Sequence, residues 1–256
     1  MPPALTKYGE TFTARGGAYE RAMATCPDAR DQEFRTLVAH LQPQPGEVIV
    51  DTPSGGGYLR RYLPDSVCYV GIDEAPDFQR ACANRMQTHD QVLAATGVDL
   101  PVPDAACDAV CSLVGLHHVA LRAPQYAEIF RILRPGGRLV LADVEVSSAP
   151  ARFLNGFVDA HLSQGHCGYF FTEHETAALD DAGFTSVRTW REDYVWVFPD
   201  FARAAAFCLD LFGLDHPLAA QRLPEVLCRD LELHAADNRS WHLPWGLRYC
   251  SGRKPP

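Results

Sequence analysis

Between residues 46 and 142 the chain alternates short apolar runs with helical stretches. Four runs read as buried strands, at 48–50, 68–72, 109–114 and 138–142. They are almost wholly apolar, which is typical of parallel strands that are covered on both faces. Helical windows separate them at 58–63, 77–86 and 124–133. This order predicts a doubly wound, mostly parallel α/β sheet.

The flanks of this region have a different, mainly helical texture. Helical segments are expected at 18–25 and 29–41, and the proline-rich stretch 42–46 then breaks the chain. After Pro150, helices are expected at 151–162, 173–182, 200–214 and 218–233, and strands at 185–190 and 241–249. We therefore divide the chain into four parts: an N-terminal helical lid (1–44), a sheet core (45–192), a helical cap (193–240) and a final strand that returns to the core (241–256).

Composition and charge exclude several classes of protein. The 256 residues carry a formal net charge of −9, so no global basic field attracts nucleic acid. No apolar run reaches the roughly 18 residues of a membrane span, and the first residues lack a signal-peptide core, so we expect a cytoplasmic protein. The only lysines, Lys7 and Lys254, leave none for a P-loop or a pyridoxal Schiff base. Nine scattered cysteines read as small buried hydrophobes in a reducing compartment.

The most informative segment is the turn after the first strand, Asp51-Thr52-Pro53-Ser54-Gly55-Gly56-Gly57. Its glycines let the backbone approach a ligand closely, and nucleotide-like ligands bind at this edge of a doubly wound sheet. A dinucleotide fingerprint would need its third glycine where Arg60 stands. A nucleophile elbow would centre on Ser54, but Thr52 occupies the position of its first glycine.

The order of motifs resembles that of class I S-adenosylmethionine-dependent methyltransferases, in their small-molecule branch. The resemblance covers 45–146 and 171–192, and it rests on Asp51-x-Pro53-x-Gly55-x-Gly57, Gly71-Ile72-Asp73-Glu74 and the stretches 100–104, 112–118, 133–139 and 171–184. It implies a Rossmann-like, seven-stranded sheet with a helical lid and a late helical insertion. It also implies the cofactor S-adenosyl-L-methionine, with S-adenosyl-L-homocysteine as product. Pro53 departs from the family pattern, because it replaces a glycine and removes a backbone donor.

The resemblance also implies roles for individual residues. The family's acid at the tip of the second strand accepts hydrogen bonds from both ribose hydroxyls, which implies that role for Asp73. The implied cofactor-binding residues are Asp51, Pro53, Ser54, Gly55, Gly57, Asp73, Glu74, Thr96, Gly97, Val98 and Leu113. In many relatives an acid after strand three accepts the adenine amino group, and here 95–98 stands in its place. Either the backbone and Thr96 replace that contact, or adenine binding is altered.

Methyl transfer is an in-line displacement, for which positioning of the acceptor supplies much of the acceleration. A phenol, enol or amine acceptor also has to lose a proton, and His117 and His118, after the fourth strand, are the candidate catalytic residues. His161, His166 and Cys167 fit no zinc signature, so no metal site is expected. Aromatic residues in the lid and the late helices favour a small, partly apolar or aromatic acceptor.

Two alternatives stay open. One is an α/β hydrolase that uses Ser54, and the other is a scaffold that binds S-adenosylmethionine without transferring its methyl group. Pro53 and the missing adenine acid are the features that point to the scaffold. The expected partner is a small-molecule acceptor, with neither nucleic acid nor membrane, and the chain is compatible with a homodimer.

Overall fold

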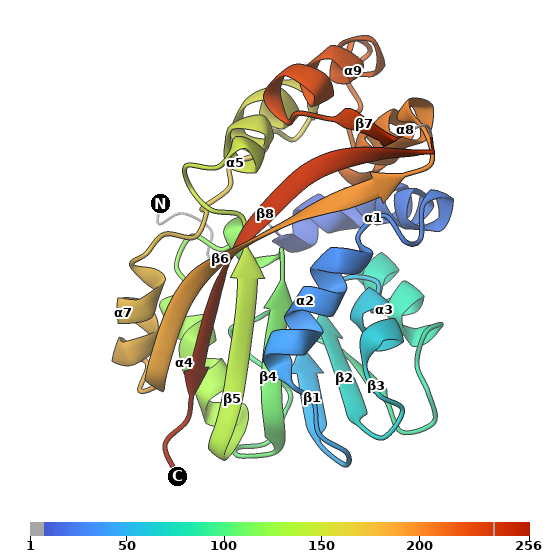
Figure 1. The fold of residues 1–256 in the computed structure, drawn as a ribbon. Coiled ribbons are helices and arrows are strands. Elements are labelled where there is room, and N and C mark those ends of the chain that lie inside the picture. Colours follow the sequence, from blue (N-terminus) through green and yellow to red (C-terminus); the bar gives the residue numbers. More distant parts are fainter. Residues whose placement is uncertain (1–7, 238) are drawn as a thin grey trace.

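A twisted sheet with helices on both faces forms the centre of the computed structural model, which describes residues 8–237 and 239–256 (Figure 1). The strand order is β3-β2-β1-β4-β5-β8-β6, and the short β7 pairs with β8 outside this path. Strands β1 to β5 are parallel, whereas β8 is antiparallel to β5 and β6. The predicted seven-stranded, mostly parallel sheet is therefore confirmed, with β7 as an addition. The strands are β1 (Val48–Asp51), β2 (Cys68–Asp73), β3 (Gln91–Ala94), β4 (Cys107–Leu113), β5 (Leu133–Asp143), β6 (Thr185–Phe198), β7 (His234–Asp237) and β8 (Ser240–Arg253).

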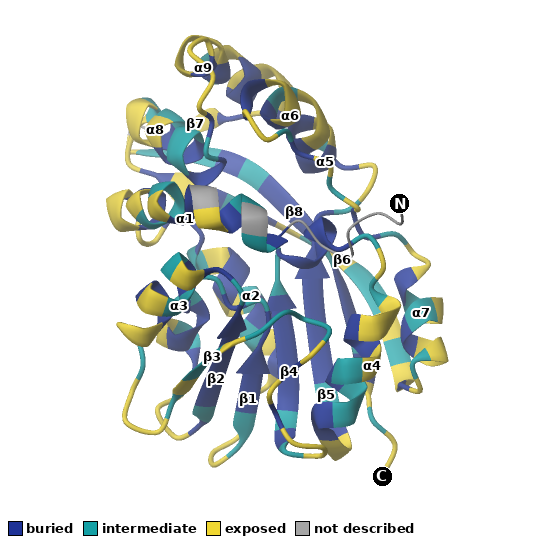
Figure 2. Cartoon of the chain, turned by 180° about the vertical axis from the view of Figure 1, so that it is seen from behind, coloured by how far each residue is buried: buried dark blue, intermediate teal, exposed yellow. Residues whose placement is uncertain are grey.

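Helices cover both faces of this sheet and its carboxyl edge. The helices are α1 (Tyr8–Thr25), α2 (Asp31–Leu41), α3 (Pro76–Ala83), α4 (Ala123–Ile132), α5 (Ala149–Phe153), α6 (Asp159–His161), α7 (Glu175–Asp181), α8 (Phe201–Leu211) and α9 (Ala219–Asp230). Short turns of other helix types are η1 (Tyr58–Tyr62), η2 (Leu116–His118) and η3 (Leu154–Val158). Figure 1 shows α2 in front of the sheet, and Figure 2 shows α4 and α7 on the opposite face. Helix α1 lies above the carboxyl ends of the parallel strands, with α8 and α9 beyond it.

Successive residues of a strand point to opposite faces, so the sheet builds two apolar cores. In β1, Ile49 packs in the core that includes Leu37 of α2. Its neighbour Val50 packs in the other core, together with Ile129 of α4. All four side chains are fully buried. Burial on both faces explains why these strands show apolar runs instead of alternation.

Strand β6 is longer than the sequence pattern predicts. Residues 193–198, assigned from the sequence to the helical cap, are strand instead. They pair with β8 as a two-stranded arm beyond the main sheet. Trp196 of β6 stacks on Trp245 of β8, with ring centroids 4.3 Å apart. Packing of aromatic side chains across the two strands stabilises this arm, and the helical part of the cap begins only at α8.

Other predicted elements differ in extent or type. The helix expected at 18–25 begins already at Tyr8, and the window 58–63 forms the single 3-10 turn η1. The helix expected at 151–162 is interrupted by the π-helical turn η3. Strand β3 had no clear apolar pattern because it forms an edge of the sheet, where its side chains are half-buried or exposed. The pattern thus identifies interior strands better than edge strands.

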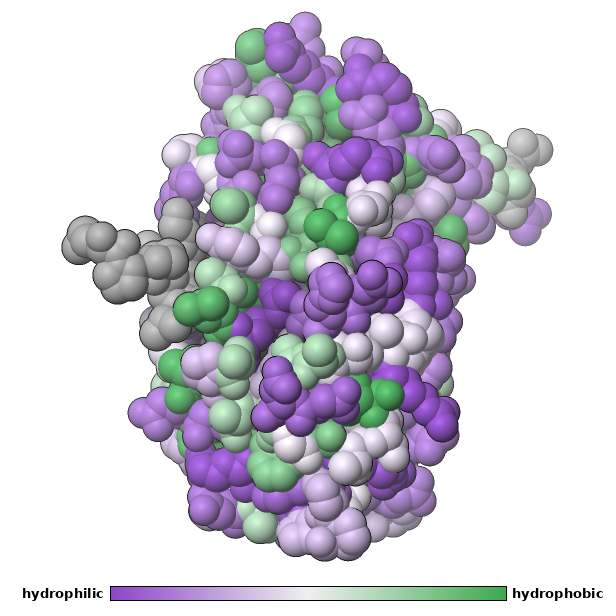
Figure 3. Space-filling view, turned by 90° about the vertical axis from the view of Figure 1, so that its left-hand side faces the viewer, coloured by the Kyte–Doolittle hydropathy of each residue, from purple (hydrophilic) through white to green (hydrophobic). Residues whose placement is uncertain are grey.

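In the part of the chain that the structure describes, no helix combines the length and the apolar character that a membrane crossing requires. On the face drawn in Figure 3, hydrophilic residues predominate and hydrophobic residues lie among them in small groups. Scattered apolar residues of this kind are ordinary for a folded domain.

Candidate functional site

The turn between β1 and η1 forms the floor of the candidate site, at the carboxyl end of the parallel strands. Gly55 and Gly57 have positive φ angles of 53° and 74°, a conformation that favours glycine. A Cβ atom on Gly57 would lie 2.6 Å from Sγ of Cys82 in α3. Glycine at position 57 is therefore needed both for the backbone conformation and for space. We refer to this turn, residues 51–57, as the glycine loop.

Pro53 is accommodated by the segment that follows β4. The Thr52–Pro53 peptide is cis. The Pro53 ring lies so close to Gly115 that a Cβ added there would be 2.3 Å from its Cγ. The departure from the family glycine is therefore matched by a glycine in the neighbouring segment.

Asp73, at the end of β2, connects the glycine loop to the N-terminal helix. Its Oδ1 accepts a hydrogen bond of 2.8 Å from the amide of Ala75. Its Oδ2 accepts hydrogen bonds of 2.8 Å from the amide of Gly55 and from the hydroxyl of Tyr8 in α1. Burial raises the pKa of the Asp73 carboxyl to about 6, although these hydrogen bonds lower it in part. The carboxylate thus receives donors from its own strand end, from the glycine loop and from α1.

Asp51, at the end of β1, is the second buried carboxyl of the site. Its Oδ2 accepts a hydrogen bond of 2.7 Å from the hydroxyl of Tyr69. Burial raises the pKa of Asp51 to about 7; the Tyr69 hydroxyl counteracts this shift, and the charge of Asp73 adds to it. The floor of the site therefore holds two carboxyls that change charge near neutral pH.

Two small cavities border these carboxyls. The glycine-loop cavity, of about 50 Å³, is lined by Tyr8, Phe12, Tyr19, Arg30, Phe34, Asp51, Pro53, Ser54, Gly55, Gly56, Tyr58, Leu59, Phe78, Leu113, Val114 and Gly115. The Gln125 cavity, of about 20 Å³, is lined by Tyr8, Thr52, Pro53, Ile72, Glu74, Ala95, Gly97, Val98, Gly115, Val119 and Gln125. Of the cofactor-binding residues expected from the sequence, Gly57, Asp73 and Thr96 line neither cavity, and the others line at least one of the two. Asp73 is hydrogen-bonded to Gly55 and Tyr8, which do line them.

Gln125 is a residue that the sequence reasoning missed. It lies in the first turn of α4 and is 2% exposed. Its Oε1 is buried without a hydrogen-bond partner among the residues that the structure describes. A buried amide oxygen without a donor is costly, so it marks a place where a ligand can supply one. The only sequence signal that could have identified Gln125 as a site residue is its polar side chain directly before Tyr126, which is buried.

A third cavity, of about 60 Å³, shares Phe12, Tyr19, Arg30 and Val114 with the glycine-loop cavity. We call it the histidine cavity, and its lining consists of Phe12, Arg15, Tyr19, Arg30, Val114, His117, His118, Leu154, Val158, His166, Trp196, Leu211, Phe212 and Trp245. The walls come from α1, the end of β4, the cap and the β6–β8 arm. Both candidate catalytic histidines therefore face an aromatic cavity that adjoins the glycine loop.

His117 is held in place by Asp143, the last residue of β5, which the sequence reasoning did not single out. The Nδ1 atom of His117 lies 2.7 Å from Oδ1 of Asp143, and its backbone amide donates to Oδ2 at 2.9 Å. Burial would raise the pKa of Asp143, but the adjacent imidazole and the amides that donate to it hold this pKa below its ordinary value. An ionised Asp143 fixes the His117 tautomer with the proton on Nδ1, so Nε2 carries the lone pair.

His166 joins the two histidines that the sequence identified. Donor atoms of His117, His118 and His166 lie within 4.8 Å of one another, a separation from which three imidazoles could hold a metal ion. The Nδ1 of His166 lies 3.0 Å from Oδ1 of Asn155. Burial, with the positive charge of Arg15, lowers the pKa of His166 to about 3. Burial also lowers the pKa of His118 well below its usual range, so both rings are neutral at physiological pH.

The other two residues considered as metal ligands lie elsewhere. The Nδ1 of His161 lies 2.8 Å from the carbonyl oxygen of Phe157, on whose ring it stacks. Cys167 is exposed. The group of His161, His166 and Cys167 is therefore not assembled, and only His166 faces the histidine cavity.

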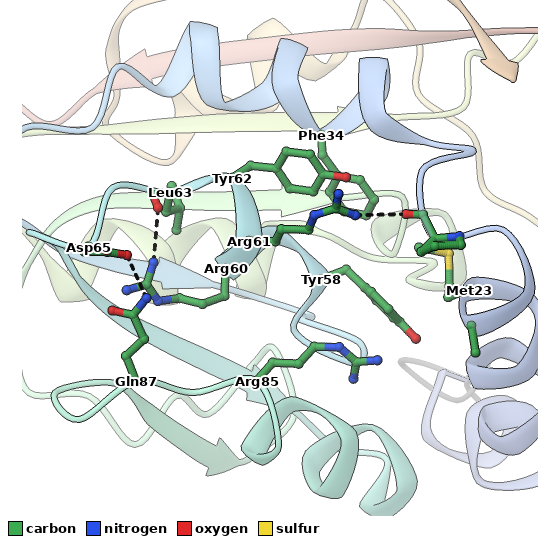
Figure 4. Close-up of a pocket in the computed structure, with 12 residues that line it drawn as sticks. Met23, Phe34, Tyr58, Arg60, Arg61, Tyr62, Leu63, Asp65, Arg85 and Gln87 are labelled. Carbon is green, nitrogen blue, oxygen red and sulfur yellow. Dashed lines mark hydrogen bonds between the residues drawn. The ribbon is translucent and has the colours of Figure 1, made fainter.

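A larger cavity, of about 450 Å³, lies between the end of α1 and η1 (Figure 4). It contains neither of the buried carboxyls and none of the three histidines. Each arginine on its wall pairs with a carboxylate: Arg60 with Asp90, Arg61 with Asp28 and Arg85 with Glu20. The Arg85 guanidinium also lies 4.0 Å from the ring centre of Tyr58. Each of these arginines thus has a carboxylate partner, although Nη2 of Arg60 has no hydrogen-bond partner among the described residues. We do not place the chemistry there, because the buried carboxyls and the three histidines lie at the other cavities.

Comparison with known proteins gives consistent matches. Residues 50–141 match a family model described as a methyltransferase domain. The chain is 31% identical over 142 residues to the 27-O-demethylrifamycin SV methyltransferase of Amycolatopsis mediterranei, a match that covers 53% of this chain and 52% of that protein. It is 28% identical over 154 residues to the demethylmenaquinone methyltransferase of Tropheryma whipplei, covering 59% and 63%. The chain thus spans between about half and two thirds of the length of these curated relatives.

The fold has close counterparts among solved structures. A structure of an S-adenosylmethionine-dependent methyltransferase from Thermotoga maritima superposes with a TM-score of 0.63. The superposition covers 96% of this chain and 99% of the other, at 18% sequence identity. At this level of identity the match speaks for the fold, which agrees with the strand order described above.

Proposed function

We propose that this chain, whose residues 50–141 belong to the methyltransferase domain family and whose sheet has the class I methyltransferase fold, transfers a methyl group from S-adenosyl-L-methionine to a small molecule. The observation that carries the proposal is the buried Asp73 carboxyl at the end of β2, which is hydrogen-bonded to the amide of Gly55. A fixed carboxylate in this position suits a pair of ribose hydroxyls.

The residues at the two small cavities fit this cofactor. Asp73 would accept the ribose hydroxyls, and Asp51 would supply negative potential to the sulfonium half. The unpartnered Oε1 of Gln125 would accept the adenine amino group in place of the missing acid. When bound, the cofactor supplies a methyl group on a positively charged sulfur. The chain itself supplies the orientation and the exclusion of water.

We place the methyl acceptor in the histidine cavity. This cavity adjoins the glycine-loop cavity, and much of its wall is aromatic, from Phe12, Tyr19, Trp196, Phe212 and Trp245. Aromatic walls favour a flat, partly apolar acceptor. The two curated relatives are named for a rifamycin and a menaquinone precursor, which are also small molecules.

His117 is proposed as the general base. Asp143 holds its Nδ1, so Nε2 can take a proton from the acceptor, and the carboxylate stabilises the imidazolium that forms. His118 is proposed as a neutral hydrogen-bonding partner of the acceptor. We propose that no metal takes part, because Arg15 on the same cavity wall adds a positive charge that opposes a bound cation.

The hydrolase alternative lacks a base beside its nucleophile. The Ser54 hydroxyl donates a long hydrogen bond of 3.4 Å to the Gly55 carbonyl oxygen and also contacts the Cys82 thiol, and no histidine is among the described residues that line the glycine-loop cavity with it. A serine nucleophile needs a base within hydrogen-bond reach. The scaffold alternative is left to experiment.

Calorimetric titration with S-adenosylmethionine and S-adenosylhomocysteine tests the function, followed by transfer of a labelled methyl group to a panel of aromatic hydroxyl compounds. We expect both ligands to bind, and transfer to proceed in the presence of a chelator. Absence of binding would overturn the proposal. Binding without transfer to any acceptor would favour the scaffold, and labelling of Ser54 by a fluorophosphonate would favour the hydrolase.

Helix α1 covers all three cavities and has to move when ligands enter. Tyr8 lines the glycine-loop and Gln125 cavities, and Phe12 and Arg15 line the histidine cavity. The volumes of about 50, 20 and 60 Å³ are far below the roughly 300–1,000 Å³ of small-molecule sites. We therefore propose that α1 is a lid that swings outward for cofactor and acceptor.

The variant Tyr8→Phe is expected to bind S-adenosylhomocysteine about three- to tenfold more tightly than the wild type. The Tyr8 hydroxyl donates to Asp73 Oδ2, the atom assigned to the ribose, so the cofactor has to displace it. Isothermal titration compares the two proteins. Tyr62→Phe, which removes a hydroxyl bonded to Asp31 instead, serves as the control. Weaker binding by Tyr8→Phe would show that the hydroxyl helps to hold the cofactor.

Cofactor affinity is expected to rise between about pH 5 and pH 8 and then to level off. The pKa values of about 6 for Asp73 and about 7 for Asp51 lie above those of an unfolded chain, so both carboxyls are protonated at the acidic end. The cationic cofactor prefers the ionised forms. Without ligand the sign is opposite: the folded chain holds these protons more tightly, so its stability falls as the pH rises from about 4, where unfolded carboxyls ionise, to about 7, and is then constant.

Titration calorimetry and thermal unfolding at several pH values measure both effects. Asp51→Asn should flatten the upper part of the affinity profile and remove part of the stability loss. An affinity that stays constant from about pH 5 to pH 8 would contradict the assignment of these two carboxyls to the cofactor.

A cytoplasmic location is a further proposal. All nine cysteines are free thiols, which suits a reducing compartment. The net charge of −9 likewise favours a small-molecule partner over nucleic acid.

A further inference from the structure

Arg15 of α1 is a buried cation without a counter-charge. Its side chain lines the histidine cavity, and the residue is 8% exposed. Nη2 donates to the carbonyl oxygen of Leu211 at 3.1 Å, and the guanidinium lies 5.1 Å from the ring centre of Phe12. Nε and Nη1 are buried without a hydrogen-bond partner in the described part of the chain. A buried, unpaired arginine is unfavourable unless a ligand completes it.

Arg30, on the wall of the same cavity, differs from Arg15 because its guanidinium has a carboxylate partner. Its Nε donates to Glu33 at 2.9 Å, its Nη2 also pairs with Glu33, and its Nη1 contacts the hydroxyl of Tyr19. Trp196 donates a further hydrogen bond to Glu33, at 2.8 Å. The fold therefore provides a carboxylate for one cavity arginine and leaves the other open toward the cavity.

The remaining polar groups of the cavity do not neutralise Arg15. Burial lowers the pKa of Arg15 to about 10, so the guanidinium stays protonated at neutral pH. His118 and His166 are neutral, and Arg15 itself contributes to lowering their pKa values. Asp143 is engaged by His117. The cavity thus carries a net positive charge among aromatic walls.

We propose that the histidine cavity binds an aromatic acceptor that carries a carboxylate, and that Arg15 forms the ion pair with this carboxylate through the unpartnered Nη1. A guanidinium is a strong, charge-assisted donor to a carboxylate, and an aromatic ring in this cavity would pack against the tryptophans and Phe212. This inference rests on the proposed function, because it names the class of acceptor for the same site. Arg15 thereby determines the specificity for the acceptor. Because Arg15 belongs to α1, its ion pair with the acceptor also helps to close the lid.

A metal ion at the three histidines is the competing occupant. The imidazole nitrogens are near enough to hold one, and the bonds of His117 to Asp143 and of His166 to Asn155 resemble the outer shell of a metal site. The unpaired positive charge of Arg15 disfavours a second cation and favours an anion. The observations therefore support an anion in this cavity more strongly than a metal ion.

Fluorescence of Trp196 and Trp245 gives a direct binding readout, because both rings line the cavity. Matched probes are 2-naphthoate and 2-naphthamide, which share a shape and differ in charge. They are titrated into the full chain with and without S-adenosylhomocysteine. We expect the wild type to bind the acid at least about tenfold more tightly than the amide.

Variants of Arg15 distinguish the contribution of charge to probe binding from the contribution of shape. Arg15→Met should lose the preference for the acid while it still binds the amide, and Arg15→Lys should keep part of it. Arg21→Met, on the exposed side of the same helix, should behave as the wild type, since Arg21 pairs with Asp210. If Arg15→Met does not fold, the ratio of the affinities for acid and amide, measured in the wild type and in Arg15→Lys, still tests the inference.

Three outcomes would overturn the inference: equal affinity of the wild type for acid and amide, an unchanged preference in Arg15→Met, or acid binding that requires added Zn²⁺. Its failure is distinguishable from failure of the proposed function, because naphthoate binding needs no turnover. Cofactor binding without acid preference removes only the inference. Acid preference without cofactor binding removes the methyltransferase proposal and leaves an anion site.

Discussion

Asp73→Ala should weaken S-adenosylhomocysteine binding at least about tenfold, and up to several hundredfold, in isothermal titration. Each hydrogen bond from a ribose hydroxyl to an ionised carboxylate contributes roughly 1.5–3 kcal/mol, and about 1.4 kcal/mol corresponds to one factor of ten. Asp73 is 1% exposed, so no water replaces the lost acceptor cheaply. The same change also removes the acceptor of the Gly55 amide, which orders the glycine loop.

A second variant separates these two contributions. Asp73→Asn keeps one oxygen as an acceptor but loses the charge, so we expect an intermediate loss of affinity with a smaller loss of thermal stability. Asp77→Asn, in the first turn of α3, is the control, because its carboxylate pairs with Arg80 near the surface. If Asp73→Ala folds and binds the ligand as tightly as the wild type, the ribose assignment is wrong.

The part of the site that the sequence could predict lies at strand ends. A carboxylate directly after an apolar run has to lie at the carboxyl edge of a parallel sheet, which is where the structure has Asp51 and Asp73. The same logic placed His117 and His118 after β4. These predictions needed only local sequence and the order of strands.

The part that could not be predicted depends on contacts between distant segments. Tyr8 meets Asp73 across 65 residues, and Asp143 meets His117 across 26. Nothing local marks Arg15 or Gln125, because an arginine or a glutamine on a helix is usually solvated. Only tertiary packing shows that both are buried with unpartnered polar atoms. Such conflicts with the rules of burial are expected at functional or strained sites.

The fold also has parts that the sequence predicts and parts that it does not. Interior strands such as β1 and β4 followed from their apolar runs, whereas the extension of β6 to Phe198 depends on aromatic packing against β8. This extension matters for the site, because Trp196 and Trp245 of the arm form a wall of the histidine cavity. The position that we propose for the acceptor therefore depends on the least predictable part of the sheet.

His117→Gln is expected to lower kcat by about 10²–10⁴-fold for an acceptor that has to lose a proton, with a much smaller change in KM. Glutamine keeps a polar side chain near the cavity but cannot take the proton that we propose is transferred to Nε2 of His117. Asp143→Asn should lower kcat as well, because an amide at that place stabilises neither the correct tautomer nor the imidazolium. His174→Gln, an exposed residue before α7, is the control and should retain full activity.

The pH profile distinguishes a base from a residue that only shapes the cavity. If His117 takes the proton, the rate of His117→Gln depends on the ionisation of the acceptor itself and increases with it as the pH rises, which changes the shape of the pH profile relative to the wild type. An acceptor with a more acidic hydroxyl should therefore rescue His117→Gln preferentially. A purely structural role would lower the rate equally for all acceptors and leave the shape of the profile unchanged. Equal loss across acceptors of different acidity would assign the proton to solvent and leave Asp143 and His117 as a packing pair at the end of β5.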